Sequence, residues 1–91
     1  MVMVGSGMIT SGILEIDVHN MSVEEAVNAV QRKVNAASAS VYRVRVIHGF
    51  NGGTAIRSAI REEFSYGRDD KVKRVAMGDN QGVTDLIIRE Y

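Results

Sequence analysis

The chain has 91 residues, no cysteine and a formal net charge of zero, with 45% hydrophobic and 24% charged residues. This length supports one small domain with a single core, and the absence of cysteine excludes disulfides and thiolate metal sites. With no net charge, any nucleic acid must bind to a local basic patch rather than to the field of the whole molecule. No segment is apolar for long enough to span a bilayer, and the N-terminus lacks the features of a secretory signal, so a cytoplasmic location is expected.

Residues 1–12 show no usable hydrophobic period. We expect them to form a flexible N-terminal arm, or an added strand at a sheet edge, before a folded domain over residues 13–91. The first expected strand is Ile13–Val18, in which apolar and polar side chains alternate with a period of two. Asp17 and His19 therefore point away from the core side of this strand.

A helix is expected to follow from Ser22. Glu25 stands three residues after Ser22, which is the spacing of a capping box. A stripe of apolar residues then recurs at helical spacing, so one side of the helix should be buried. Its members are Val23, Ala26, Val27, Val30, Val34 and Ala37.

The most informative stretch runs from the second expected strand, Val41–His48, through a glycine-rich loop into a second helix from Thr54 to about residue 66. Thr54 is a good N-cap residue, and the helix start presents free backbone N–H groups that suit an anion. We therefore predict a phosphate-binding site here. Its expected residues are Gly49, Asn51, Gly52, Gly53, Thr54 and Arg57.

Two further strands, Val72–Met77 and Val83–Tyr91, are joined by a turn at Gly78–Gly82 that suits a short hairpin loop. The order is then β-α-β-α-β-β. Two βαβ units of normal length require parallel neighbours and right-handed crossovers, which put both helices on one face. Because the strands alternate, only one face of the sheet is buried, and the expected fold is a two-layer α/β (α+β) sandwich.

The sheet face without helices, called the helix-free face below, should carry charged side chains. Asp17, Arg43 and Arg45 are expected to meet on it. The two arginines are candidates for nucleic-acid binding, because guanidinium groups pair with phosphates. The alternative without a binding function is a solvated face, on which Asp17 forms a cross-strand ion pair with Arg43 or Arg45.

Both histidines of the chain, His19 and His48, are expected at the edge where parallel strands place their carboxyl ends. Together with Asp17 they are the candidate catalytic residues. Two histidines near one phosphate could give and take protons. The alternative is that each is a hydrogen-bonded structural residue.

Two motifs carry a family resemblance. Residues 16–20 resemble the motif L-D-L-H-G of Smr (small MutS-related) domains, with Asn20 in place of the glycine. Residues 47–57 resemble the second motif, I-H-G-x-G-x-G followed by an apolar residue and arginine, with a loop that is one residue longer. Residues 82–84 also resemble the last strand of the family, so the chain resembles a stand-alone Smr domain over about residues 13–91.

The resemblance implies a sandwich similar to the C-terminal domain of translation initiation factor three. Its four-stranded mixed sheet would have the order 1-2-4-3, with the fourth strand central and antiparallel. Some Smr domains are endonucleases that cut RNA or nick DNA, and the Asp-x-His motif and the glycine loop are the regions implicated in them. The resemblance thus implies a nucleic-acid partner, RNA or DNA.

Three functions stay open on the sequence. The first is an endonuclease, in which His19 and His48 share proton transfers without a metal, or His19 joins Asp17 in holding a divalent ion such as Mg²⁺ or Mn²⁺. The second is a non-catalytic module that binds nucleic acid or the ribosome. The third is a protein-interaction module that uses the helix-free face.

Overall fold

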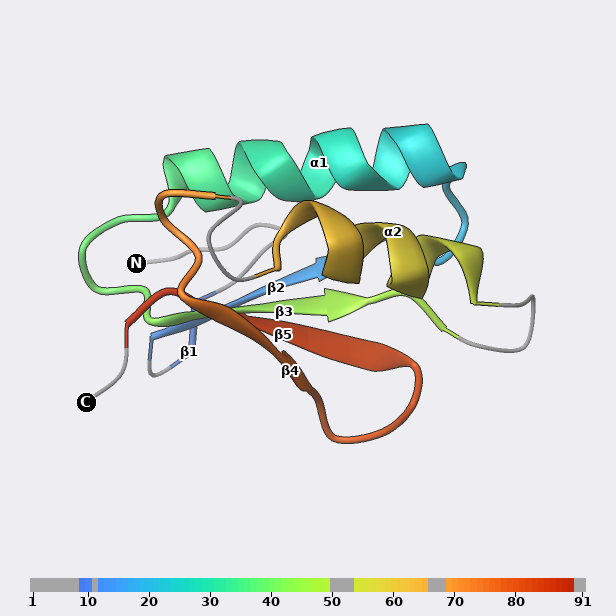
Figure 1. Ribbon diagram of the computed structural model, residues 1–91. Coiled ribbons are helices and arrows are strands. Elements are labelled where there is room, and N and C mark those ends of the chain that lie inside the picture. Colours follow the sequence, from blue (N-terminus) through green and yellow to red (C-terminus); the bar gives the residue numbers. More distant parts are fainter. Residues whose placement is uncertain (1–8, 11, 50–53, 66–68, 90–91) are drawn as a thin grey trace, which may run out of the picture.

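A computed structural model of the chain describes residues 9–10, 12–49, 54–65 and 69–89. Two helices lie side by side over the same face of one twisted sheet (Figure 1). The elements, in chain order, are β1 Ile9–Thr10, β2 Ile13–Asp17, α1 Val23–Ala36, β3 Arg43–Ile47, α2 Ala55–Glu63, β4 Arg74–Met77 and β5 Val83–Ile87.

The sheet has the strand order β1-β2-β3-β5-β4. β2 and β3 are parallel, whereas β5 is antiparallel to both of its neighbours, β3 and β4. The expected two-layer fold and the order of its four main strands are therefore confirmed. The described part of the N-terminal segment, β1, pairs antiparallel with β2 and is an added edge strand, which is one of the two forms expected for residues 1–12.

The expected elements are present, but several are shorter than the sequence indicated. The third main strand begins at Arg74 rather than Val72, and the last ends at Ile87 rather than Tyr91. Hydrophobic alternation continues past both limits, because residues next to a strand can stay buried without belonging to the ladder. Val72 is an example, since it is buried. Ile88 is buried too, and its N–H still donates to the Tyr42 carbonyl at 2.8 Å.

The start of α1 follows the sequence. The Ser22 side chain accepts from the Glu25 backbone N–H, and the Glu25 side chain accepts from the Ser22 N–H, so the predicted capping box is complete. The buried side of the helix differs in two residues from the expected stripe. Ala29 is buried, whereas Val23, the first residue of the helix, is 38% exposed.

Ile60 of α2 and its C-cap residue Phe64 are the largest fully buried side chains, and both belong to the hydrophobic core. The expectation for its N-cap was only half right. Thr54 occupies the N-cap position, but its side chain makes no capping hydrogen bond. No helix within the described part of the chain is long and apolar enough to cross a membrane.

Candidate active site at the carboxyl ends of the parallel strands

The end of β2 and the turn after it position the first two candidate residues. The Val18 N–H donates to the Ile47 carbonyl of β3, which extends the parallel pairing by one step. The Met21 N–H then donates to the Val18 carbonyl at 3.0 Å and closes a turn with His19 and Asn20 at its centre. The turn thus forms with Asn20 where the family motif has glycine.

Asp17 and His19 form a hydrogen-bonded pair on the surface. The Asp17 Oδ1 atom accepts from the His19 ring Nδ1 at 2.5 Å and from the His19 backbone N–H at 3.1 Å. These two bonds, the ring bond first, lower the pKa of the Asp17 carboxyl from its ordinary value of 3.8. Asp17 is therefore ionised at neutral pH and can only accept.

This pairing fixes the tautomer of the His19 ring. Because an ionised carboxylate has no proton to donate, Nδ1 carries the hydrogen, and the neutral ring presents a lone pair at Nε2. The side chain is 52% exposed, and Nε2 has no hydrogen-bond partner among the described residues. The His19 ring is thus oriented by Asp17 and is half-exposed, so it could act as a base.

His48 lies in a different environment. It is 5% exposed, and both of its ring nitrogens have protein partners. Nδ1 donates to the Gly49 carbonyl at 2.8 Å, so in the neutral ring Nε2 accepts from the Thr84 hydroxyl, also at 2.8 Å. The ring therefore has no free lone pair to offer a substrate. Its hydrogen bond to Thr84 links the end of β3 to β5.

The prediction that both histidine rings reach one phosphate stays a prediction, but the hydrogen bonds of His48 and the strand register do not favour it. The register pairs Asp17 with Ile47, so His48 follows the buried parity of Val44 and Val46 on the helix side. Asp17 and its partner His19 belong to the helix-free face. Strand alternation already indicated this difference in the sequence. Asp17 and Val18 face opposite sides of the sheet, and so do Ile47 and His48.

The start of the glycine loop is held against the β4–β5 hairpin. The Gly82 carbonyl accepts from the backbone N–H groups of both His48, at 2.9 Å, and Gly49, at 3.0 Å. Gly49 has a φ of +73°, which disfavours any residue with a side chain. A Cβ atom at this position would lie 3.6 Å from the His19 Cβ, so the loop leaves the sheet directly beside the Asp17–His19 pair.

Replacing Thr84 with valine should reduce the free energy of unfolding by about 1–3 kcal/mol, because His48 Nε2 would then be buried without a donor. Urea unfolding followed by circular dichroism measures the change. Thr54→Val is the matched control, since it swaps the same hydroxyl for a methyl group where no capping bond exists, and it should change stability by less than about 0.5 kcal/mol. Equal losses in the two variants would show that the Thr84–His48 bond contributes nothing.

The candidate nucleic-acid ligands Arg43 and Arg45 are engaged within the protein. Asp85 is 1% exposed and lies opposite Arg45 in β5. Its carboxylate accepts from Arg43 Nη1 at 2.9 Å and from Arg45 Nε at 3.4 Å, while Glu15 lies 3.6 Å from Arg45 Nη1. The arginines meet on the helix-free face as expected, but their partners are Asp85 and Glu15 rather than Asp17.

Asp85 and Thr84 are the two important residues that sequence reasoning missed. Asp85 shares a face with Arg43 and Arg45 once β5 is placed antiparallel beside β3. The sequence indicated only part of this arrangement, because alternation assigns the acidic Asp85 to the helix-free face but does not give its partners. Thr84 gave no such signal, because only the pairing of β3 with β5 brings it to His48.

The rest of the expected phosphate site is only partly described. Asn51, Gly52 and Gly53 lie outside the described residues. Arg57 is half-buried in the first turn of α2 and, within the described ranges, has no hydrogen-bond or ion-pair partner. The Arg57 guanidinium therefore follows the loop closely in sequence, and no acidic group of the described ranges neutralises its charge.

The described residues do not fit a divalent metal held by protein ligands. In residues 9–10, 12–49, 54–65 and 69–89, no three His, Asp or Glu side chains are grouped so that they could hold an ion. Asp17 and His19 are bonded to each other, which leaves one nitrogen and one oxygen facing outward. We therefore assign no step to Mg²⁺ or Mn²⁺.

Comparison with known proteins places the fold in a family. The family model of the Smr domain matches residues 16–84, which is three quarters of the chain and includes both motif regions. The chain belongs to the Smr domain family. Among solved structures, it is similar to the Smr domain of MutS2 from Thermus thermophilus, with 32% identity, a TM-score of 0.73 and coverage of 84% of this chain and 98% of that one. Among curated proteins no match was found.

Within this Smr domain, the two family motifs occupy one edge of the sheet. The first supplies the exposed Asp17–His19 pair, and the second supplies the buried His48 and the left-handed Gly49. The two motif histidines thus have different environments, one at the surface and one in the hydrogen-bonded frame beneath it.

Proposed function

We propose that this Smr domain is an endonuclease that cleaves RNA with His19 as the general base. The Smr domain family is associated with nucleic acids, and some of its members are endonucleases. The observation that carries the proposal is the half-exposed His19 ring, whose Nδ1 is bonded to Asp17 and whose Nε2 has no partner among the described residues. A base oriented by a carboxylate is the arrangement that proton abstraction requires.

The proposed reaction uses the substrate's own 2′-hydroxyl group. His19 Nε2 takes the 2′-OH proton, the 2′-oxygen attacks the adjacent phosphorus, and the bond from phosphorus to the 5′-oxygen breaks. The 5′-oxygen takes a proton from water, which leaves a 2′,3′-cyclic phosphate. Asp17 stabilises the protonated imidazole, because its carboxylate is ionised and bonded to Nδ1.

The glycine loop and Arg57 are proposed to hold the phosphate. Gly49 leaves the sheet beside His19, and the loop continues through Asn51, Gly52 and Gly53 to Thr54 and α2. Backbone N–H groups at such a helix start bind phosphate oxygens, and Arg57 adds a positive charge. His48 is assigned the task of holding this loop on the Gly82 carbonyl and Thr84 rather than a proton transfer.

A panel of three substrates tests the reaction. Labelled RNA should be cut, whereas DNA of the same sequence and RNA with one 2′-O-methyl group at the cut site should not, because neither offers the nucleophile. The product should carry a cyclic phosphate, which mass spectrometry identifies, and chelator should not stop the reaction. Cleavage of DNA that chelator abolishes would contradict this mechanism and favour a metal-dependent nuclease.

A second candidate is a module that binds nucleic acid or the ribosome without cleaving it. The observation in its favour is that His48 is engaged on both nitrogens, so the described residues offer one proton-transfer histidine rather than two. This candidate predicts binding of all three substrates and cleavage of none.

A further inference from the structure

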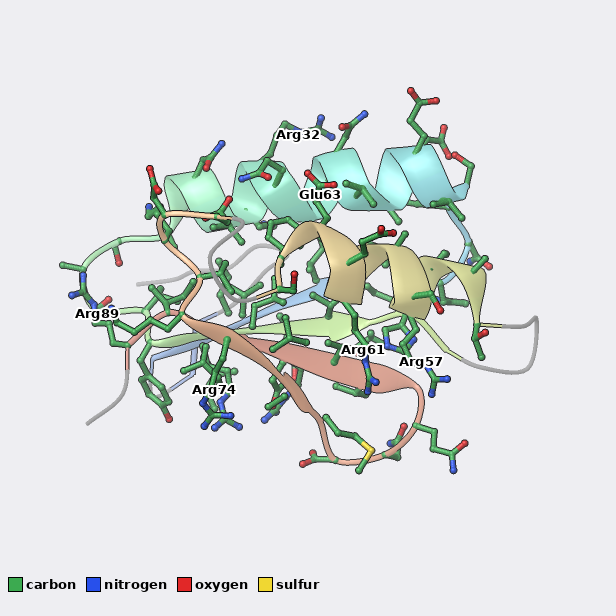
Figure 2. The ribbon with its side chains drawn as sticks, viewed as in Figure 1. Arg32, Arg57, Arg61, Glu63, Arg74 and Arg89 are labelled. Carbon is green, nitrogen blue, oxygen red and sulfur yellow. The ribbon has the colours of Figure 1, made fainter. Side chains whose placement is uncertain are left out.

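Two neighbouring arginines on α2 have no partner in the part of the chain that the structure describes. Within the described ranges, neither Arg57 nor Arg61 has a hydrogen bond or ion pair. Figure 2 shows both side chains leaving α2 on the side of the β4–β5 hairpin, away from α1, while Glu63 leaves it toward α1. They are called the α2 arginine pair below.

Helix geometry explains why the pair is aligned. Residues four apart in a helix lie one turn apart on the same face, with their Cβ atoms about 5–6 Å from each other. Ile60 and Phe64 are buried beside this face, so the arginines border the core and their stems can cover its edge. Glu62 and Glu63 are rotated away from Arg61 by about 100° and 200°, so neither shares its face.

The helix-free face offers a weaker site for phosphate. Arg43 and Arg45 are 34% and 20% exposed, and both are bonded to the buried carboxylate of Asp85. A phosphate there would compete with a carboxylate already in place. Arg57 and Arg61 have no such partner within the described ranges, so their charge is more available to a ligand than that of Arg43 and Arg45, which the strand pattern had placed among the candidates.

We propose that the α2 arginine pair holds two neighbouring phosphates of a single nucleic-acid strand, which passes over α2 beside the β4–β5 hairpin. This extends the proposed function, because the glycine loop that leads into α2 starts next to His19. We expect the bound nucleic acid to be one strand rather than a duplex. The α2 arginine pair provides only a single short row of positive charge on one helix turn. Arg61 thereby joins Arg57 as a substrate-binding residue.

The salt dependence of binding tests the proposal. The full chain is titrated into a labelled single-stranded RNA whose 2′-hydroxyls are all methylated, so that it cannot be cleaved, and affinity is measured by polarisation at several salt concentrations. Each phosphate contact to a single strand contributes about −0.7 to the slope of log K against log salt. Arg61→Gln should therefore flatten the slope by about 0.7, and Arg57→Gln with Arg61→Gln by about 1.4.

Two controls separate a defined contact from general attraction. Arg61→Lys keeps the charge and should keep the slope. Arg32→Gln removes an exposed arginine from α1, where Figure 2 shows it on the far side of that helix, and should leave the slope unchanged. A flattening by Arg32→Gln as large as that by Arg61→Gln, or no flattening in the double variant, overturns the proposal, as does a wild type that binds duplex RNA more tightly than the single strand.

The same measurements distinguish this proposal from the proposed function. If the slopes change as expected while the wild type cleaves no substrate, the arginine pair stands and the endonuclease fails. If RNA is cleaved while the double variant keeps the wild-type slope, the endonuclease stands and the arginine pair falls. A wild type that does not bind the methylated strand at low salt contradicts the arginine pair directly.

Discussion

Replacing His19 with alanine is expected to slow RNA cleavage by about 10²–10⁴-fold, the usual contribution of a general base. The free energy of unfolding should change by less than about 0.5 kcal/mol, because the side chain is half-exposed and its ring bonds only to Asp17. RNA affinity should also be retained, since the phosphate contacts are proposed for the loop and α2 rather than for His19. Single-turnover cleavage, polarisation and urea unfolding measure the three quantities.

Asp17 offers a companion test of the same pair. Asp17→Asn should slow cleavage less than His19→Ala, because the ring keeps Nε2 but loses the charge that fixes its tautomer. The double variant should be no slower than His19→Ala alone, since the two residues act as a unit. Additive losses would mean that Asp17 acts separately, and full activity of His19→Ala would remove the proposed mechanism and leave a binding module.

Replacing Asp85 with asparagine is expected to be the most destabilising single change on the helix-free face. Removing one partner of a buried ion pair costs about 3–5 kcal/mol, because the opposite charge is left without compensation. Arg43 and Arg45 are partly exposed and can regain some water, so we expect a loss of about 3 kcal/mol. At about 4–8 °C per kcal/mol for a domain of this size, thermal unfolding should detect it easily.

Glu15 provides the matched control for Asp85. It faces the same Arg45, but its side chain is 52% exposed and the closest approach is 3.6 Å. Glu15→Gln should therefore cost no more than about 1 kcal/mol, the usual contribution of a surface ion pair. If the two variants lose equal, small amounts of stability, the arginines are satisfied by water and the Asp85 network does not hold the sheet.

The sequence by itself determined most of the fold. Alternation with a period of two, the Ser22–Glu25 capping box and the apolar stripes gave the elements, and the lengths of the crossovers required both helices on one face. These signals are local, so they can be read without knowing which strands pair. Element ends were less well predicted, because burial and single backbone hydrogen bonds continue past the strand limits, at residues such as Val72 and Ile88.

The candidate site was only partly determined in this way. Asp17 and His19 are two residues apart, so their spacing already allowed the pair that the structure forms. The environment of His48 depends on Thr84, which is 36 positions away along the chain, and the partners of Arg43 and Arg45 depend on Asp85 in the same strand. Only the antiparallel pairing of β5 with β3 brings these residues together. Such a pairing depends on the packing of the whole sheet and not on the residues within either strand alone. That pairing buries His48 of this Smr domain against Thr84, whereas the His19 side chain is half-exposed.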